Sequence, residues 1–483
     1  MTRNTMRWSA AVLAAMVSGL LLAADPITPA TVAKPSIEAH AKPDFASPTV
    51  ATFSKNAPVK VSGQQGLWFQ LALDGGKTGY VRVNDVRVAY GKAETGGAAQ
   101  ALFTGKASKG RVSETASVRG IDESDLKAAS FNAAQLKLME SYRATPEAAE
   151  QAAAKRGWTA TQVAYAIEYQ PGKAKGSGKG GATQAEKRER FGMARGLLSS
   201  VGGRLGGGVG ATAAASGDKL IGKSEDEVAQ EELELGPLIA GRVLGAAPLV
   251  KDPAMQKRVN LIGRWLASRS SRPELPWTFG VIDDGEINAF AAPGGYILIT
   301  RGLYQLLGSD DEVAAVLGHE LSHVVQRDHY EVLRKQELQG AGRDVALSRV
   351  NTGGGVAGSL ARGYIERNGA AIMLTQLDRN AEYRADQAAG FYLARAGANP
   401  LVYYAVLQKM TALGSSSQRL TQLYKTHPPL DKRLDALDKQ GYKGLEPYRI
   451  ADRGRPGRCG KAGLRRPFLF TRCALHRCWA MLT

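Results

Sequence analysis

The sequence predicts a multidomain protein in which a small all-β barrel is followed by a helical and linker region and then by a mainly α domain of the α+β class. The chain has 483 residues, which corresponds to about three folding units at roughly 150 residues each. Short alternating strands run from 36 to 90, whereas apolar residues recur at helical spacing over 121–169 and again over 310–334. These patterns divide the chain into a signal peptide at 1–24, a barrel at 25–90, a helical segment at 91–170, a flexible linker at 171–225, a third domain at 226–448 and a basic tail at 449–483.

Composition and charge exclude several classes of protein. Hydrophobic residues make up 44% and charged residues 22% of the chain, ordinary globular values that fit neither wholesale disorder nor a protein with many membrane spans. The net charge of +18 is partly local, because 449–483 holds nine Lys or Arg against one Asp. The remaining excess is spread out, and neither a basic helix with interleaved aromatic residues nor zinc-finger spacing occurs, so no nucleic-acid partner is expected.

The two ends of the chain indicate its compartment. Arg3 and Arg7 precede the uncharged, Ala- and Leu-rich segment 8–24, which is the pattern of a cleaved signal peptide. No later stretch is long and apolar enough to cross a bilayer, so the cleaved protein is expected to be periplasmic or secreted. All three cysteines lie in 449–483, which leaves no disulfide framework before them, and this tail is expected to carry neither a metal site nor a defined structure.

The N-terminal barrel is predicted from five short strands and a hairpin turn at 74–76. The strands are expected at 36–40, 49–53, 59–61, 67–71 and 80–83. The sequence from Gly66 to Leu71 and from Asp74 to Val81 resembles bacterial SH3-like domains, which often carry cell-envelope enzymes to peptides or glycan. The resemblance implies a cell-wall or peptide ligand for this domain, although its aromatic residues fit core positions better than a ligand groove.

The third domain contains an HExxH sequence at 319–323. A helix is expected over Asp310–Arg334, because acidic residues stand at its positive end and apolar residues recur every three or four positions. Four helical positions turn through about 400°, so the imidazoles of His319 and His323 project about 40° apart and can share a tetrahedral cation. Glu320 lies beside the metal instead of binding it, which makes this the HExxH zinc motif.

A third protein ligand is needed, and two residues downstream are candidates. His329 stands at the spacing of the HExxHxxGxxH pattern, but Gln326 replaces the helix-breaking glycine, so in an unbroken helix His329 faces away from the metal. Glu382 is the favoured candidate and lies in a second segment with helical spacing. Asp386 follows four residues later on the same face, where it can accept a hydrogen bond from the outer nitrogen of a ligating imidazole.

Four blocks of sequence together resemble the HtpX and CAAX-prenyl-protease family of gluzincin metallopeptidases, in its soluble extracytoplasmic branch. They are the HExxH sequence, the pair Glu382 and Asp386, the segment 288–296, and His427-Pro428-Pro429 with Arg433. The resemblance implies one Zn²⁺ per chain, endopeptidase activity and a helical active-site core with a small sheet. The ligands would be His319, His323 and Glu382, with Glu320 as the general base for a zinc-activated water.

The two remaining blocks are the segment 288–296 and His427 with Arg433. A strand is expected at Asn288, Ala289, Phe290 and Ala291, before a Pro-Gly-Gly turn. The resemblance implies that substrate adds to the edge of this strand in an extended conformation. A buried hairpin without that role would explain Phe290 equally well. His427 is either a group near the developing oxyanion or simply the residue that precedes two prolines. Arg433 is a candidate for holding that segment or for lining the cleft.

Two classes of function therefore remain. The first is a zinc-dependent endopeptidase that hydrolyses peptide or unfolded-protein substrates of the cell envelope. The alternative is an envelope-binding or chaperone-like protein with a structural or latent zinc site. Three protein ligands are visible, and a structural site normally has four, which favours an open catalytic site. If His427 occupied the water position, the enzyme would be latent.

Overall fold

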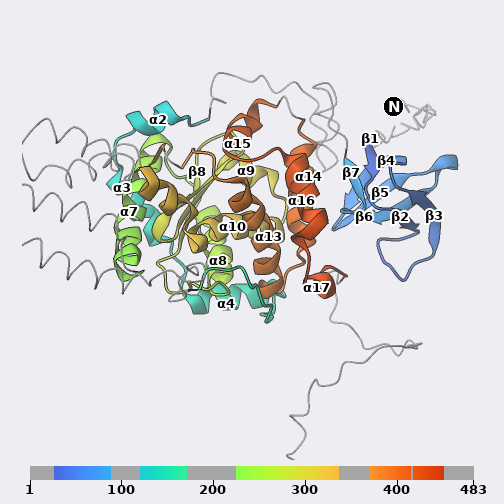
Figure 1. The fold of residues 1–483 in the computed structure, drawn as a ribbon, viewed down its shortest axis with the longest axis horizontal. Coiled ribbons are helices and arrows are strands. Elements are labelled where there is room, and N and C mark those ends of the chain that lie inside the picture. Colours follow the sequence, from blue (N-terminus) through green and yellow to red (C-terminus); the bar gives the residue numbers. More distant parts are fainter. Residues whose placement is uncertain are drawn as a thin grey trace, which may run out of the picture.

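The computed structural model describes residues 27–88, 120–170, 225–336, 370–371, 373–414 and 417–450. The expected signal peptide, most of the expected linker and nearly all of the basic tail lie outside these residues. Figure 1 shows an all-β unit on one side and a largely helical part with a small sheet on the other. We call residues 27–88 the β-unit and the described residues from 225 onward the C-terminal part. The predicted multidomain class, with an all-β unit ahead of a mainly α domain, is confirmed.

The β-unit is a seven-stranded antiparallel sheet with the order β3-β2-β6-β5-β4-β1-β7. Its strands are β1 (Thr28–Val32), β2 (Ser36–His40), β3 (Thr49–Ser54), β4 (Pro58–Gln65), β5 (Trp68–Ala72), β6 (Thr78–Arg82) and β7 (Val86–Val88). Two of them were not expected, because Pro29 interrupts the strand pattern of β1 and β7 is only three residues long. Trp68 and Phe69 are buried, as expected of core aromatic residues.

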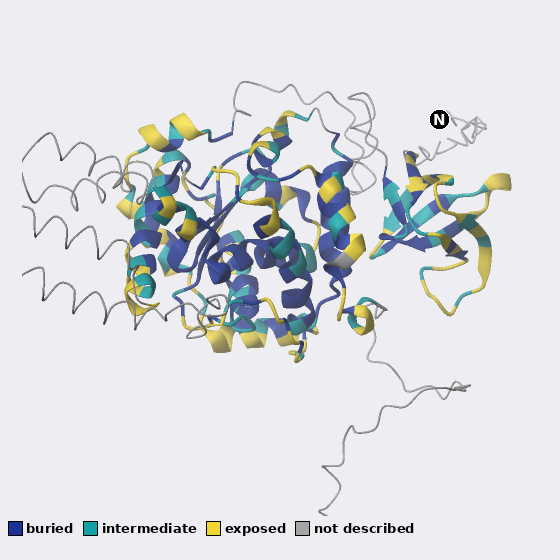
Figure 2. Ribbon diagram, viewed as in Figure 1, coloured by how far each residue is buried: buried dark blue, intermediate teal, exposed yellow. Residues whose placement is uncertain are grey.

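Three short helices follow the β-unit. They are α2 (Glu123–Ala128), α3 (Ala133–Ser141) and α4 (Pro146–Lys155). The expected apolar face of this segment is only partly correct: Leu126, Leu136 and Met139 are buried, whereas Phe131 and Leu138 are 44% and 41% exposed. Figure 2 shows the exposed sides of α2 and α4 on the outside of the molecule.

The C-terminal part surrounds a three-stranded sheet with helices. Its longer helices are α7 (Glu225–Ala246), α8 (Pro253–Ala267), α10 (Asp310–Gln326), α13 (Arg379–Ala396) and α14 (Leu401–Thr411). The shorter ones are α9 (Arg301–Leu306), α15 (Thr421–Thr426), α16 (Leu430–Ala436) and α17 (Glu446–Ile450), with the turns η3 (Pro293–Gly295), η4 (Gln418–Leu420) and η5 (Leu437–Gly441). Within the described residues, no helix is both long and apolar enough to span a membrane.

The small sheet has the order β8-β10-β9, so β9 is an edge strand. The strands are β8 (Thr278–Ile282), β9 (Ala289–Ala292) and β10 (Tyr296–Thr300). The predicted strand, turn and returning strand correspond to β9, η3 and β10, with Tyr296 opposite Ala292 in antiparallel register. β8 pairs with β10 in parallel and was not expected. Phe290 and Tyr296 are buried, as expected of core residues.

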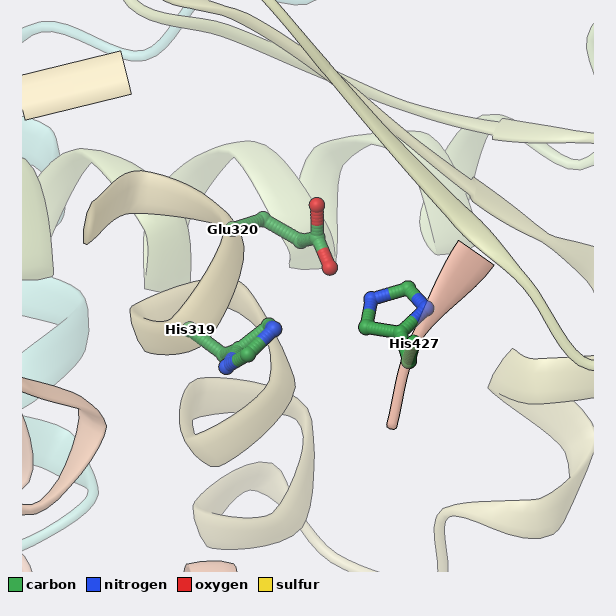
Figure 3. A group of neighbouring side chains, drawn as sticks. All are labelled: His319, Glu320 and His427. Carbon is green, nitrogen blue, oxygen red and sulfur yellow. The ribbon is translucent and has the colours of Figure 1, made fainter. Parts of the chain in front are cut away.

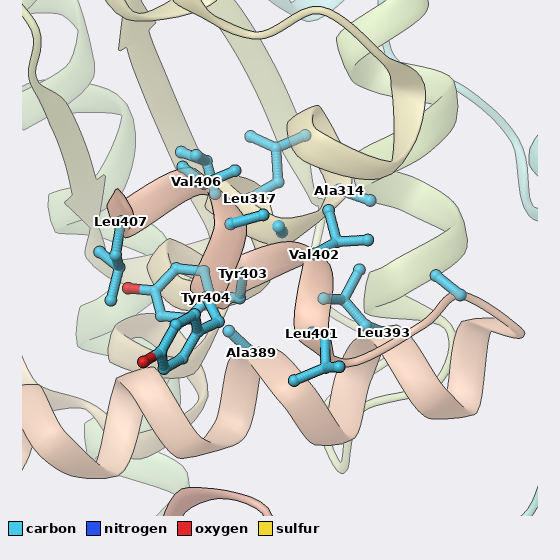
Figure 4. Packing of buried hydrophobic residues seen from close by; sticks show 14 of the residues in the cluster. Ala314, Leu317, Ala389, Leu393, Leu401, Val402, Tyr403, Tyr404, Val406 and Leu407 are labelled. Carbon is cyan, nitrogen blue, oxygen red and sulfur yellow. The ribbon is translucent and has the colours of Figure 1, made fainter. Parts of the chain in front are cut away.

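Helix α10 lies at the centre of the C-terminal part, packed against α13, α14 and α8 (Figure 1). Every residue from Val313 to Gln326 is buried, which follows from the apolar residues that surround its polar positions. Ser309 caps the N-terminus, where its side chain accepts a hydrogen bond from the backbone N–H of Glu312. Figure 4 shows how Ala314 and Leu317 of α10 pack with apolar side chains of α13 and α14.

The expected helix over Asp310–Arg334 is interrupted. Helix α10 ends at Gln326, and Arg327 adopts the left-handed conformation with φ 63° and ψ 29°. The backbone N–H of Arg327 donates to the carbonyl oxygens of His323 and Val324, which closes the last turn. A separate helical segment begins at Asp328. The spacing of apolar residues does not change where a single non-glycine residue adopts the left-handed conformation. The break at Arg327 could therefore not be predicted from that spacing.

Candidate metal centre

Two adjacent helices bring His319, His323 and Glu382 together. His319 and His323 lie one turn apart on α10, and Glu382 lies in the first turn of α13. The two Nε2 atoms are 3.3 Å apart. Glu382 Oε2 is 3.8 Å from Nε2 of His319, and Oε1 is 3.6 Å from Nε2 of His323. All three side chains are buried, so none of these polar atoms can be satisfied by bulk water.

The donor set fits a divalent cation. The outer nitrogen of each ring faces a carboxylate: Nδ1 of His319 is 3.0 Å from Asp386 Oδ1, and Nδ1 of His323 is 2.9 Å from Asp328 Oδ2. When each Nδ1 carries the proton, both Nε2 atoms keep their lone pairs and lie next to the Glu382 carboxylate. Its Oε2 is buried and has no hydrogen-bond partner within the part of the chain that the structure describes. Ligand nitrogens around a tetrahedral zinc ion lie roughly 3.3 Å apart. A cation between them would satisfy all three groups.

The outer side of His319 is held by a charged cluster. Arg433 donates to both oxygens of Asp386, from Nη2 to Oδ1 at 2.6 Å and from Nε to Oδ2 at 3.0 Å. The hydroxyl of Tyr403 donates to Asp386 at 2.7 Å and lies 3.0 Å from His319 Nδ1. Burial would raise the pKa of Asp386, but the Arg433 guanidinium and the His319 hydrogen bond outweigh it and hold that pKa far below its usual range. Asp386 therefore stays a carboxylate.

His323 has a corresponding arrangement on its own outer side. Asp328 accepts from Nδ1 with one oxygen, and Arg384 pairs with the other. Burial would lower the pKa of His323, but the Asp328 hydrogen bond and the nearby carboxylates outweigh burial and raise this pKa to about 9. Neither Asp328 nor Tyr403 was identified from the sequence. Tyr403 lies in an apolar helical pattern, and Asp328 follows a helix break that periodicity does not reveal.

Glu320 lies next to the metal ligands and lines a pocket. It is 5% exposed, and burial raises the pKa of its carboxyl group. Figure 3 shows the carboxylate pointing toward the imidazole of His427, with His319 beside both. His319, Glu320 and His427 each offer one ligand atom within 4.8 Å of the others. A water molecule in this space could contact Glu320 and His319 together.

His427 reaches this space from the segment that follows α15. Its Nδ1 is 2.8 Å from the hydroxyl oxygen of Thr426, and its Nε2 is 3.7 Å from Glu382 Oε2. Burial is the main cause that lowers the pKa of His427 well below its ordinary value, with the positive charge of Arg433 adding to it. The ring is therefore neutral, and its Nε2 can serve as a donor or as a ligand.

A pocket opens between the edge strand β9 and helix α14. Asn288 and Ala289 line it next to Glu320, and its remaining wall is largely apolar. The apolar wall consists of Leu303, Val316, Leu407, Met410 and Leu423. The side-chain oxygen of Asn288 is buried and has no hydrogen-bond partner among the described residues, so it is available to a ligand that carries an N–H group. Ala291 continues the same edge strand and is buried.

His329 is not part of either ligand group among the described residues. Its expected position was nevertheless wrong in one respect. Because the helix breaks at Arg327, the ring of His329 does not face away but lies 5.8 Å from the ring of His323. Burial lowers the pKa of His329 to about 3, and its buried Nδ1 has no hydrogen-bond partner in the described part of the chain.

The fold and this group of side chains define a metallopeptidase of the gluzincin type. The family model described as Peptidase family M48 matches residues 253–440. A relative named protease HtpX from Xylella fastidiosa is 31% identical over 254 residues, which cover 42% of this chain and 81% of the relative. The chain belongs to peptidase family M48.

Two other relatives are also named as proteases. A protein named beta-barrel assembly-enhancing protease from Escherichia coli K12 is 29% identical over 210 residues, which cover 42% of this chain and 42% of the relative. The metalloprotease LoiP from Escherichia coli K12 is 25% identical over 172 residues, 35% of this chain and 66% of the relative. The match to the assembly-enhancing protease thus spans about two fifths of its length.

Proposed function

We propose that this protein is a zinc-dependent endopeptidase of the extracytoplasmic space, with one zinc ion per chain held by His319, His323 and Glu382. The observation that carries this proposal is the convergence of three buried side chains: the two Nε2 atoms are 3.3 Å apart, and the Glu382 oxygens lie 3.6 and 3.8 Å from them. The outer nitrogens of both imidazoles face carboxylates. Three protein ligands leave one position of a tetrahedral ion for water or substrate, which is typical of catalytic sites.

The reaction is hydrolysis of a peptide bond. A zinc ion at this site would polarise the scissile carbonyl and lower the pKa of a bound water molecule to about 7. Glu320 lies within reach of the same space and accepts the proton of the attacking water on its carboxylate. It then passes that proton to the nitrogen of the leaving amine. General acid–base catalysis of this kind contributes roughly 10²- to 10⁴-fold to the rate.

The substrate is held along β9 and in the pocket beside it. On its outer side β9 pairs with no strand among the described residues, so an extended peptide can add to this edge through backbone hydrogen bonds. The unpartnered oxygen of Asn288 can accept a further N–H from the same peptide. The five apolar side chains of the pocket wall favour an aliphatic substrate side chain next to the scissile bond. Such side chains are accessible in unfolded proteins and are buried in folded ones, so we propose unfolded envelope proteins as the substrate class.

Two arguments support the compartment and the substrate. The N-terminal sequence has the pattern of a signal peptide. One relative is named for enhancing the assembly of β-barrels, which is a process of the cell envelope. A role in quality control of envelope proteins is therefore the proposed context for this chain.

The experiment that tests the function compares the wild type with Glu320→Gln. The wild type should contain one zinc ion per chain by elemental analysis and should cleave casein, and a chelator should abolish the cleavage. Glu320→Gln should keep the zinc and lose nearly all hydrolysis. The matched control is Glu331→Gln, which changes an exposed glutamate in the helical segment that follows α10 and should cleave casein at close to the wild-type rate. A Glu320→Gln protein with wild-type turnover would refute the assignment.

The position of His427 favours one second candidate, a latent or structural zinc site in an envelope-binding or chaperone-like protein. Its Nε2 is 3.7 Å from the carboxylate of Glu382, close enough to act as a fourth ligand after a small side-chain movement. His427→Ala distinguishes the two candidates. If the wild type is an active enzyme, the variant cleaves casein at the wild-type rate or more slowly. If the site is latent, the variant gains activity that the wild type lacks, and a zinc-loaded protein inactive in both forms points to the binding function.

A further inference from the structure

The turn after α10 directs a second carboxylate toward the metal site. Asp328 comes directly after the left-handed residue Arg327 and is 9% exposed. Its Oδ2 lies 2.9 Å from Nδ1 of His323, and its Oδ1 pairs with Arg384 of α13. In an unbroken helix, position 328 would lie five residues after His323 and roughly 140° away from it around the axis. The contact therefore depends on the break at Arg327.

The break is held by a buried ionic network. Arg327 Nε donates to Glu232 Oε2 at 2.7 Å, and Glu232 on α7 is fully buried. Arg272 donates to both oxygens of Glu232, at 2.9 and 2.8 Å, and also to the carbonyl of Val324 in the last turn of α10 at 3.2 Å. A non-glycine residue in the left-handed region persists only when its surroundings fix it, and such outliers concentrate at functional sites.

We propose that Asp328 is a positioning residue for the metal site, which fixes the tautomer and orientation of His323 and raises its affinity for zinc. A carboxylate on the outer nitrogen keeps the proton on Nδ1, so that Nε2 presents its lone pair to the metal. Each imidazole then has its own carboxylate and each carboxylate its own arginine. Asp386 with Arg433 serves His319, and Asp328 with Arg384 serves His323.

The arrangement also gives a role to Arg384, which lies between Glu382 and Asp386 on α13. One helix supplies a metal ligand, the carboxylate behind His319, and the cation that holds the carboxylate behind His323. Loss of Asp328 leaves His323 free to rotate or to change its tautomer without removing any ligand atom. The expected consequence is a weaker metal site in a folded protein.

The test measures metal affinity, since the inference rests on the proposed zinc site. The dissociation constant for Zn²⁺ is measured on the full-length protein by competition with a chromophoric chelator. Asp328→Ala should weaken zinc binding roughly 10- to 100-fold. Asp328→Asn keeps an acceptor oxygen without the charge and should weaken binding less, but at least threefold. The visible spectrum of the Co²⁺-loaded protein should also change in both variants, because the geometry of one ligand changes.

The control is Asp310→Asn, which removes a carboxylate paired with two arginines at the opposite end of α10, about 20 Å from His323. It should bind zinc with wild-type affinity. Circular dichroism of the metal-free proteins shows whether each variant folds, and if Asp328→Ala does not, Asp328→Asn decides alone. Zinc affinity within twofold of the wild type in a folded Asp328 variant would overturn the inference and leave the proposed function intact. A wild type that binds no zinc would instead overturn the proposed function.

Discussion

The side-chain amide of Gln408 on α14 is bonded to the backbone of Val88 in the β-unit. The Val88 N–H donates to Oε1 at 3.1 Å, while Nε2 donates to the carbonyls of Val83 at 3.1 Å and Val86 at 2.6 Å. Gln408 is fully buried and lies five residues after Tyr403, which contacts His319. The β-unit is thus fastened to a helix of the metal centre. The β-unit and the C-terminal part are therefore joined by these buried hydrogen bonds as well as by the intervening chain.

This contact predicts a large effect of Gln408→Leu on stability. Leucine has a similar volume but leaves one N–H and two carbonyl groups of β7 and its neighbouring turn without partners. Each buried unsatisfied group costs about 1–3 kcal/mol, so the free energy of unfolding should fall by about 3 kcal/mol or more. Urea unfolding followed by circular dichroism measures this. Gln151→Leu, on the exposed side of α4, should change it by no more than about 0.5 kcal/mol. Equal losses in the two variants would contradict the role of the contact.

Arg433 predicts a second stability effect, because it neutralises a buried carboxylate. Arg433 is 2% exposed, and Asp386, the carboxylate with which it pairs within the described residues, is 1% exposed. Arg433→Met keeps much of the volume and leaves Asp386 as an uncompensated buried charge. Removing one partner of a buried pair typically costs about 3–5 kcal/mol. Thermal unfolding of the metal-free protein should therefore show a much lower midpoint for Arg433→Met. The comparison is Arg301→Met, which breaks an exposed pair with Asp283 and should cost about 1 kcal/mol or less.

The sequence allowed the fold class to be predicted because its patterns are local. Alternation in the β-unit, the capped α10 and the Pro-Gly-Gly turn between β9 and β10 each depend on neighbouring residues. The choice of Glu382 as the third ligand came from its spacing to Asp386 on one helical face and from the resemblance to a family. Residues 324–381 separate Glu382 from the HExxH sequence, and no local pattern fixes how two helices meet.

What could not be predicted depends on tertiary contacts. The left-handed Arg327 is held by Glu232, which lies almost a hundred residues earlier in the chain. The position of Asp328 follows from that break, so it could not be assigned without it. In the sequence, Tyr403 fits the apolar pattern of α14. Only the packing of α14 on α10 brings its hydroxyl group next to His319. β8 was missed because it pairs in parallel with β10 instead of forming a hairpin with the strand that follows it.

Replacing either of two helical glycines by alanine should change the free energy of unfolding, but in opposite directions. Gly236 lies within α7, where an added Cβ would be 2.3 Å from the carbonyl oxygen of Pro293 in the turn after β9. Gly318 lies within α10, where the nearest atom would be 3.5 Å away, an ordinary contact. Alanine in a helix is favoured over glycine by about 0.5–1 kcal/mol. Gly318→Ala should therefore stabilise the protein slightly, whereas Gly236→Ala should destabilise it despite the better helix propensity, because backbone must move. Urea unfolding of both variants checks the two signs, and a stabilised Gly236→Ala would show that α7 does not pack this closely on the turn.

The N-terminus of α10 predicts a pH-dependent contribution to stability. Asp310 accepts from Arg258 Nε at 2.5 Å and pairs with Arg156 through its other oxygen. Burial would raise the pKa of Asp310, but the hydrogen bonds and charges of the two arginines outweigh it, and this pKa is lowered in the folded protein. A lowered pKa means that the folded state holds the proton less tightly than the unfolded state, where the value is about 3.9. The stabilisation is therefore complete above that unfolded value and is lost as the pH falls through the folded one.

Asp310→Asn removes the charge and with it this pH dependence. At pH 7 the variant should be less stable than the wild type by about 1 kcal/mol, the size of a partly exposed ion pair. At pH 3 the gap should be narrower, because the wild type then begins to lose the same interaction by protonation. Urea unfolding of metal-free wild type and variant at both pH values measures the gap, and the titration of all other groups cancels in the difference. A gap that stays constant from pH 7 to pH 3 would show that protonation of Asp310 is not linked to unfolding, and that the two arginines do not lower its pKa.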